Sequence, residues 1–85
     1  MDKILYLTLK KKWFDLISSG EKKIEYREIK PYWTKRLFDN GNSKKFDFII
    51  FKNGYTKNSP KIKVEFLGIT KNKMYEILLG GVLKE

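Results

Sequence analysis

Apolar and polar residues alternate along several short stretches of this chain, and this period of two predicts β-strands with one buried face. The predicted strands are residues 3–10, 22–29, 46–52, 61–69 and 74–84. The third of them, FDFIIFK, is rich in aromatic and β-branched residues, which favour strands. The last is expected to bend at Gly80-Gly81, because glycine inside a strand marks a bend or a bulge.

A first helix is predicted over residues 11–19, where the apolar period changes from two to that of an amphipathic helix. The residues with this spacing are Trp13, Leu16 and Ile17, and Phe14 widens the face that they form. Gly20 follows as a residue that ends a helix, because glycine enters the left-handed conformation without steric cost.

A second helix is predicted over residues 31–39, which begin with a proline that suits the first helical turn. Trp33 and Leu37 lie one turn apart on one face, while Tyr32 and Arg36 share another face at the same spacing. The polar stretch that follows, NGNSKK, is expected to be a loop.

Five or six short strands with two short helices in the N-terminal half define an α+β fold. Eighty-five residues allow one small domain, 1–85. A small domain with so many strands protects its sheet edges best by curling the sheet into a barrel. We therefore expect a small β-barrel with the two helices on its rim.

The chain carries 19 Lys and Arg against 10 Asp and Glu, a formal net charge of +9. On so small a domain this is a strong positive field, and polyanions are its natural partners. The alternative is that excess lysine keeps a small protein in solution. Only Arg27 and Arg36 are arginines, and they lie within ten residues of each other. Because arginine offers a planar fork for phosphate or carboxylate, their closeness indicates a place where geometry matters.

Neither cysteine nor histidine occurs in the chain. There is therefore no disulfide partner and no thiolate nucleophile, and the usual zinc ligands and the Ser-His-Asp triad are excluded. We expect no metal and no cofactor. The N-terminal MDKILYLTLKKKW lacks the pattern of a signal peptide, and the longest unbroken apolar run is far too short for a membrane span. These features predict a cytoplasmic protein with no membrane partner.

The segment GEKKIEYR, residues 20–27, concentrates charges of both signs. Glu25 and Arg27 are two residues apart on one predicted strand and share a face. Strict alternation places Lys22 on the opposite face, so a contact between Lys22 and Glu25 depends on the turn at Gly20. Two interpretations remain open: a lysine-held carboxylate beside an arginine in a site, or a strand edge with surface ion pairs worth about 0–1 kcal/mol each.

GEKKIEYR also fits the pattern Gly-x-Lys-x-x-Glu-x-Arg through Gly20, Lys22, Glu25 and Arg27. In this motif the chain resembles the ASCH domain (activating signal cointegrator homology), a relative of the PUA RNA-binding fold. The segments YREIKPYWTKRL, FIIFKNGY and VEFLGI are similar to those of its small bacterial and phage members. The resemblance implies a PUA-like β-barrel with a basic cleft, lined by the three charged motif residues, for RNA or a nucleotide-like ligand.

Further candidate binding residues come from their chemistry. Arg36 is suited to bind phosphate, and Tyr32 is suited to stack on a base. Trp33 is a candidate for stacking too, but its spacing to Leu37 favours a core position. Asn53 and Tyr55, at the turn after the FIIFK strand, offer amide contacts and another ring, or are an ordinary turn asparagine and a packing tyrosine. The lysine run at 10–12 is expected to be a solvated face.

Three functions follow from these residues, and RNA or nucleotide binding is the first. The second is a small hydrolase that acts on RNA or a modified nucleoside, since some ASCH-like proteins are similar to acetylcytidine amidohydrolases or to ribonucleases. The amidohydrolase pattern uses the motif lysine, present here as Lys22, but has a threonine where this chain has Glu25, which here would act as a general base. The third is a module that binds an acidic protein through residues 31–38.

Overall fold

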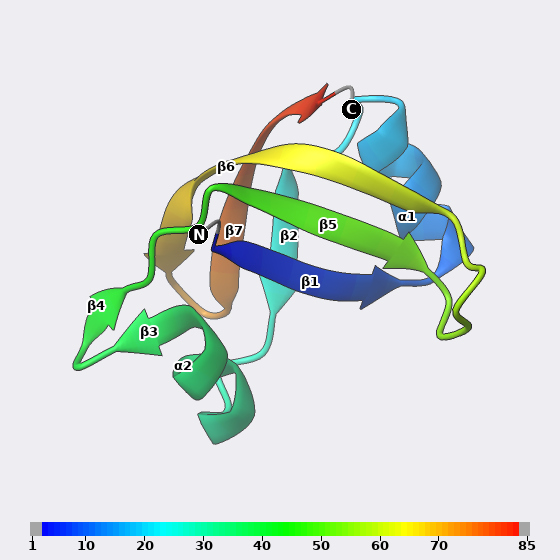
Figure 1. The fold of residues 1–85 in the computed structure, drawn as a ribbon. Coiled ribbons are helices and arrows are strands. Elements are labelled where there is room, and N and C mark those ends of the chain that lie inside the picture. Colours follow the sequence, from blue (N-terminus) through cyan, green and yellow to red (C-terminus); the bar gives the residue numbers. More distant parts are fainter. Residues whose placement is uncertain (1–2, 84–85) are drawn as a thin grey trace.

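The computed structural model describes residues 3–83, which form a curled five-stranded sheet, a separate two-stranded hairpin and two helices (Figure 1). The elements are β1 (Ile4–Leu9), α1 (Lys11–Ser18), β2 (Ile24–Arg27), α2 (Pro31–Leu37), β3 (Phe38–Asp39), β4 (Asn42–Ser43), β5 (Phe48–Asn53), β6 (Lys61–Lys71) and β7 (Tyr75–Leu83). The predicted α+β class and both predicted helices are confirmed. Within residues 3–83, neither helix has the length and apolar character needed to cross a membrane.

The strand order in the main sheet is β1-β5-β6-β7-β2. β1 pairs with β5 in parallel, and the other neighbours are antiparallel. The sheet curls like part of a barrel, but β1 and β2 remain its two edges and do not pair with each other in the described part of the chain. The expected barrel is therefore a half-barrel that is open between β1 and β2.

The second helix and the second strand are shorter than predicted, and the predicted loop 40–45 contains a strand. The second helix ends at Leu37 and not at residue 39, because Phe38 is extended and the β3–β4 hairpin begins there. Asn40 and Gly41 form its two-residue turn with positive φ angles of 52° and 83°, the turn that Asn-Gly favours, so the predicted loop contains a strand. The predicted strand 22–29 is shortened to β2, because the residues before it belong to the turn after α1.

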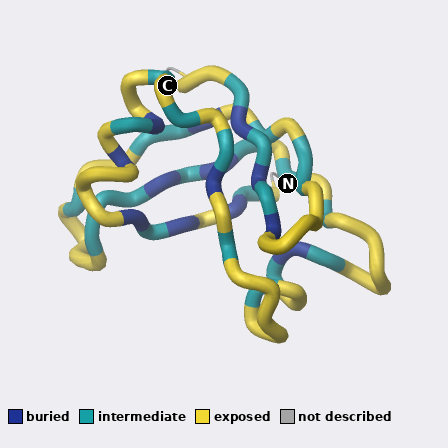
Figure 2. The backbone as a smooth tube through the Cα atoms, turned by 180° about the vertical axis from the view of Figure 1, so that it is seen from behind, coloured by how far each residue is buried: buried dark blue, intermediate teal, exposed yellow. Residues whose placement is uncertain are grey.

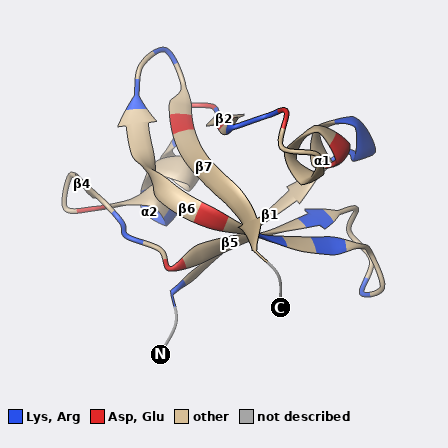
Figure 3. Ribbon diagram, turned by 90° about the horizontal axis from the view of Figure 1, so that it is seen from above, with Lys and Arg blue, Asp and Glu red and all other residues tan. Residues whose placement is uncertain are grey.

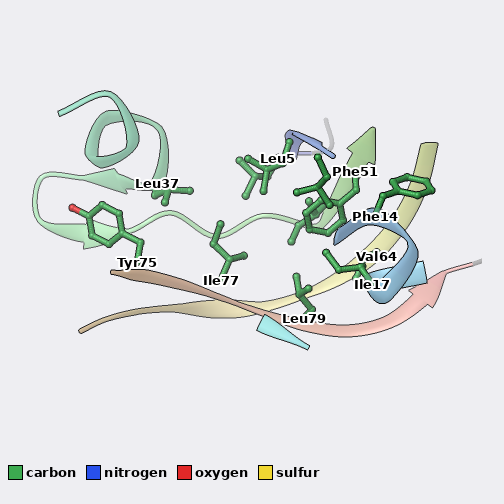
Figure 4. Packing of buried hydrophobic residues seen from close by; sticks show 12 residues of the cluster. Leu5, Phe14, Ile17, Leu37, Phe51, Val64, Tyr75, Ile77 and Leu79 are labelled. Atoms are coloured by element: carbon green, nitrogen blue, oxygen red, sulfur yellow. The ribbon is translucent and has the colours of Figure 1, made fainter. Parts of the chain in front are cut away.

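The hydrophobic core lies inside the curl of the sheet, where alternate residues of β1, β5 and β7 are buried together with Val64 of β6 (Figures 2 and 4). α1 contributes Phe14 and Ile17, and α2 contributes Leu37. Trp13, which was expected on the apolar face of the first helix, is 41% exposed. The helix is rotated so that Phe14 and Ile17 face the sheet and Trp13 faces solvent.

The pairing of β6 with β7 contains two compensating irregularities. Between the pairs Val64–Val82 and Phe66–Leu79, β7 carries an extra residue at Gly80-Gly81. The next pair, Gly68–Leu78, shows that β6 then carries an extra residue of its own. Bulges bend a strand and increase its twist. The predicted bend at the two glycines is therefore confirmed, and it contributes to wrapping the sheet around the core.

We predict that Gly80→Ala destabilises the fold, whereas Gly81→Ala has little effect. A Cβ at position 80 would lie 2.8 Å from the Cβ of Glu65, an atom that cannot move without its strand, but a Cβ at position 81 meets nothing within 4 Å. Overpacking of this kind costs about 1–3 kcal/mol. Urea unfolding of the two variants measures the difference, and equal midpoints would show that β7 does not need the close approach.

Candidate functional site

The turn after α1 brings Lys22 back toward β2. Gly20 has a positive φ of 85°, and its amide donates a hydrogen bond to the carbonyl of Ile17 at 3.1 Å. The amide of Lys22 donates to the carbonyl of Leu16 at 3.0 Å, so the backbone of Lys22 is fixed to the last turn of the helix. This is the left-handed reversal with which glycine ends a helix, and the chain therefore enters β2 with Lys22 close to the strand.

Lys22, Glu25 and Arg27 form a buried ion-paired cluster, here called the charged triad. The Nζ of Lys22 lies 2.8 Å from Oε1 of Glu25, and Nη2 of Arg27 lies 2.7 Å from Oε2. The Glu25 side chain is only 6% exposed, and those of its two partners are 17% and 18% exposed. The contact between Lys22 and Glu25, which the sequence left open, is made. The interpretation of these residues as a surface ion pair is wrong.

The side chain of Arg27 also contacts β1, the other edge strand of the sheet. Its Nη2 donates to the backbone carbonyl of Thr8 in β1 at 3.4 Å, and its guanidinium lies 4.9 Å from the ring centre of Trp33. Its Nε is buried without a hydrogen-bond partner. Arg27 therefore connects β2, β1 and α2 across the gap that the half-barrel leaves.

Arg36 contacts the same edge from α2. Its Nη2 donates to the carbonyl of Tyr6 and its Nη1 to the hydroxyl of Tyr32, both at 3.0 Å. Its guanidinium lies 5.5 Å from the ring centre of Trp33, which packs against the hydrophobic core. The proximity of the two arginines in the sequence thus reflects a shared structural contact on β1. The core interpretation of Trp33 agrees with this packing.

A cleft of about 530 Å³ lies where β1 and β5 end, next to the charged triad. Its lining consists of Thr8, Leu9, Lys10, Lys11, Trp13, Glu25, Tyr26, Arg27, Asn53, Gly54 and Tyr55. Four of the predicted site residues therefore come together in it: Glu25, Arg27, Asn53 and Tyr55. Lys22 is absent from the lining but is bonded to Glu25, whereas Tyr32 and Arg36 lie together elsewhere, at the edge of β1.

Trp13 and two of the lysines beside it are cleft residues that the sequence did not predict. Trp13 lines the cleft, and the Nζ of Lys22 stands 4.7 Å from its ring centre. Lys10 and Lys11 also line it, although their run was expected to be only a solvated face. The available signal was weak: tryptophan is rarely fully buried, and Trp13 directly follows three lysines.

The cleft combines three kinds of chemistry. Lys10 and Lys11 supply positive charge at its rim, the rings of Trp13 and Tyr55 supply stacking surfaces, and Asn53 supplies an amide that both donates and accepts hydrogen bonds. Within residues 3–83 no group of three potential metal-binding side chains occurs. The arrangement suits a flat, anionic ligand that lies between rings and lysines.

Comparison of the chain with protein-family models, with curated proteins and with solved structures finds no match. A functional assignment therefore depends on the geometry of the cleft and of the charged triad.

We predict that Glu25→Gln lowers the free energy of unfolding by about 3–5 kcal/mol, because it leaves two largely buried cations without their anion. The matched control is Asp15→Asn, which breaks the exposed pair between Lys11 and Asp15 and should cost less than about 1 kcal/mol. Chemical denaturation of both variants tests the difference. Similar losses for the two would mean that the triad does not stabilise the fold.

Proposed function

We propose that this protein is an ASCH-type, PUA-like module that binds single-stranded RNA or a nucleotide-like ligand in the cleft at the ends of β1 and β5. The observation that carries the proposal is the meeting of exposed rings and lysines in one cleft whose single carboxylate, Glu25, is already neutralised. A cytoplasmic location, where RNA is an abundant polyanion, belongs to the same proposal.

Electrostatics support an anionic ligand. Within the lining, Glu25 is the one acidic side chain, and both of its oxygens are bonded to cations. Lys10 has no ion-pair partner within residues 3–83, and Lys11 pairs only with the exposed Asp15. A phosphate at the rim therefore meets positive charge without a facing carboxylate, which favours binding and makes it sensitive to salt.

Aromatic residues support a nucleobase as the flat part of the ligand. Tyr55 is 89% exposed, so its ring is open to a partner. Trp13 is 41% exposed, and the Nζ atoms of Lys12 and Lys22 lie 4.9 and 4.7 Å from its ring centre. A base that stacks on such rings gains about 1–3 kcal/mol for each contact, largely independent of its sequence. Asn53, in the same lining, offers the donor and acceptor pair with which an amide recognises base edges.

Binding is better supported than hydrolysis. A general base must reach the proton that it removes, and its lone pairs must be available to that proton. In the charged triad Oε1 of Glu25 accepts from Lys22 and Oε2 from Arg27. The carboxylate therefore serves first to hold two cations in place, and its use as a base would require one of these contacts to open.

The experiment that tests the proposal is an amide NMR titration of the labelled protein with a short single-stranded RNA near physiological salt. We expect shifts that cluster in residues 8–11, 25–27 and 53–55, because these segments line the cleft. Shifts spread thinly over the lysines, and abolished by a modest increase in salt, would contradict a defined site. Addition of acetylcytidine or RNA with product analysis reports any turnover in the same samples.

We predict that Tyr55→Ala weakens RNA binding by roughly five- to a hundredfold, the loss of one stacked base. Because Tyr55 is almost fully exposed, its removal should leave the unfolding midpoint unchanged. Tyr55→Phe is the matched control, since it keeps the ring and should bind nearly as well as the unmodified protein. An equal loss in both variants would assign the effect to the hydroxyl group and would contradict stacking.

A further inference from the structure

The outer face of β1, β5 and β6, on the side away from the core, carries a second set of rings and cations. Strand alternation buries Leu5, Ile49 and Val64 on the inner side, so their neighbours in the chain point outward. Among the outward residues are Tyr6, Thr8, Phe48, Lys52, Lys61 and Lys63. In Figure 1, β1, β5 and β6 lie side by side and neither helix crosses them on the near side.

Lys52 and Lys61 are direct partners in the antiparallel register of β5 and β6. Side chains in such positions have Cβ atoms about 4.5–5.5 Å apart, and like charges there destabilise the sheet. Within residues 3–83, neither lysine has an ion-pair partner. Figure 3 shows the resulting concentration of basic residues where β5 and β6 meet their connecting turn. An anion that binds between the two ammonium groups relieves the repulsion between them.

The acidic residue on the outer face of β6, Glu65, is directed elsewhere. Glu65 lies opposite Phe48 in the register of β5 and β6, but its carboxylate lies against Gly80 of β7. Lys63 lies instead over the ring of Phe48, with Nζ 4.0 Å from the ring centre. The three lysines of the outer face thus remain available to a polyanion in the described part of the chain.

This cationic row begins at the cleft. Thr8 pairs with Lys52, so that Thr8, Lys52 and Lys61 form one row across three strands, and Thr8 also lines the cleft. The neighbouring row on the same face, farther from the cleft, contains Tyr6, which is 57% exposed, and Lys63. At the edge of β1 beside Tyr6 lie Arg36 and Tyr32, the two predicted binding residues that the cleft does not include.

We propose that a single strand of nucleic acid held in the cleft continues over this outer face, with its phosphates on Lys52, Lys61 and Lys63 and a base against Tyr6. This inference rests on the proposed function of the cleft. A folded acidic protein is the less suitable occupant, because the face is continuous with the cleft and sets an exposed ring, Tyr6, beside lysines, which suits a base with its neighbouring phosphates. β1 is about 20 Å long at 3.3 Å per residue, enough for several nucleotides.

The test compares two probes and two triple variants. Uridine monophosphate is small enough for the cleft alone, whereas an oligouridylate of about ten nucleotides reaches the outer face as well. Replacement of Lys52, Lys61 and Lys63 by Gln should weaken binding of the oligonucleotide by roughly tenfold to a hundredfold. It should also reduce the slope of log K against log salt by about 2, because each lost phosphate contact contributes about 0.7. Binding of uridine monophosphate should be unchanged.

The matched control replaces Lys35, Lys71 and Lys73 by Gln, which removes the same charge from exposed positions on α2, at the end of β6 and in the turn after it. This control should keep the original salt slope. Equal effects of the two triple variants would overturn the inference, because they would show diffuse attraction by net charge. If uridine monophosphate binds in the cleft and the longer probe binds no more tightly, the inference is also overturned, but the proposed function is not. If neither probe binds the unmodified protein, the proposed function itself fails.

Discussion

The burial of the Glu25 carboxylate is the constraint on which the rest of this small structure depends. An ion taken out of water costs several kcal/mol unless partners of opposite charge replace its hydration. Lys22 and Arg27 supply that replacement, and both must therefore stand at fixed positions around one carboxylate. The requirement is met by the reversal of the chain at Gly20, after α1, and by the way the chain then enters β2. One buried charge thus links local backbone geometry to the wall of the cleft.

The same constraint explains how an open half-barrel keeps its shape. β1 and β2 are the sheet edges, and no backbone ladder joins them in the described residues. The guanidinium of Arg27, held by Glu25, reaches the outer carbonyls of β1, and Arg36 does the same from α2. A planar group with several donors can bind an anion or a ring and a carbonyl at once, which a lysine ammonium cannot do with the same geometry. The two arginines are therefore used where side chains must replace strand pairing.

The sequence predicted the parts of this arrangement that depend on local periodicity. Alternation located the five strands of the main sheet, and the glycine pair located the bend in β7. It could not decide whether Lys22 meets Glu25, because that contact depends on the path of the turn. It placed Trp13 wrongly, because the rotation of a short helix is set by which residues fit the sheet, here Phe14 and Ile17. The bridging contacts of the arginines join residues up to 30 positions apart and leave no local signal.

The distribution of charge connects stability with the proposed function. The buried charges of the triad are paired, whereas surface lysines are mostly unpaired in the described part of the chain. Two of these lysines, Lys52 and Lys61, lie directly opposite each other on neighbouring strands. Self-repulsion at a net charge of +9 destabilises the compact state. A bound polyanion removes that repulsion only in the folded protein, because only the sheet brings these lysines together. The proposed binding of a nucleic-acid strand would therefore be coupled to the stability of the fold through the surface, whereas the triad stabilises the fold with or without ligand.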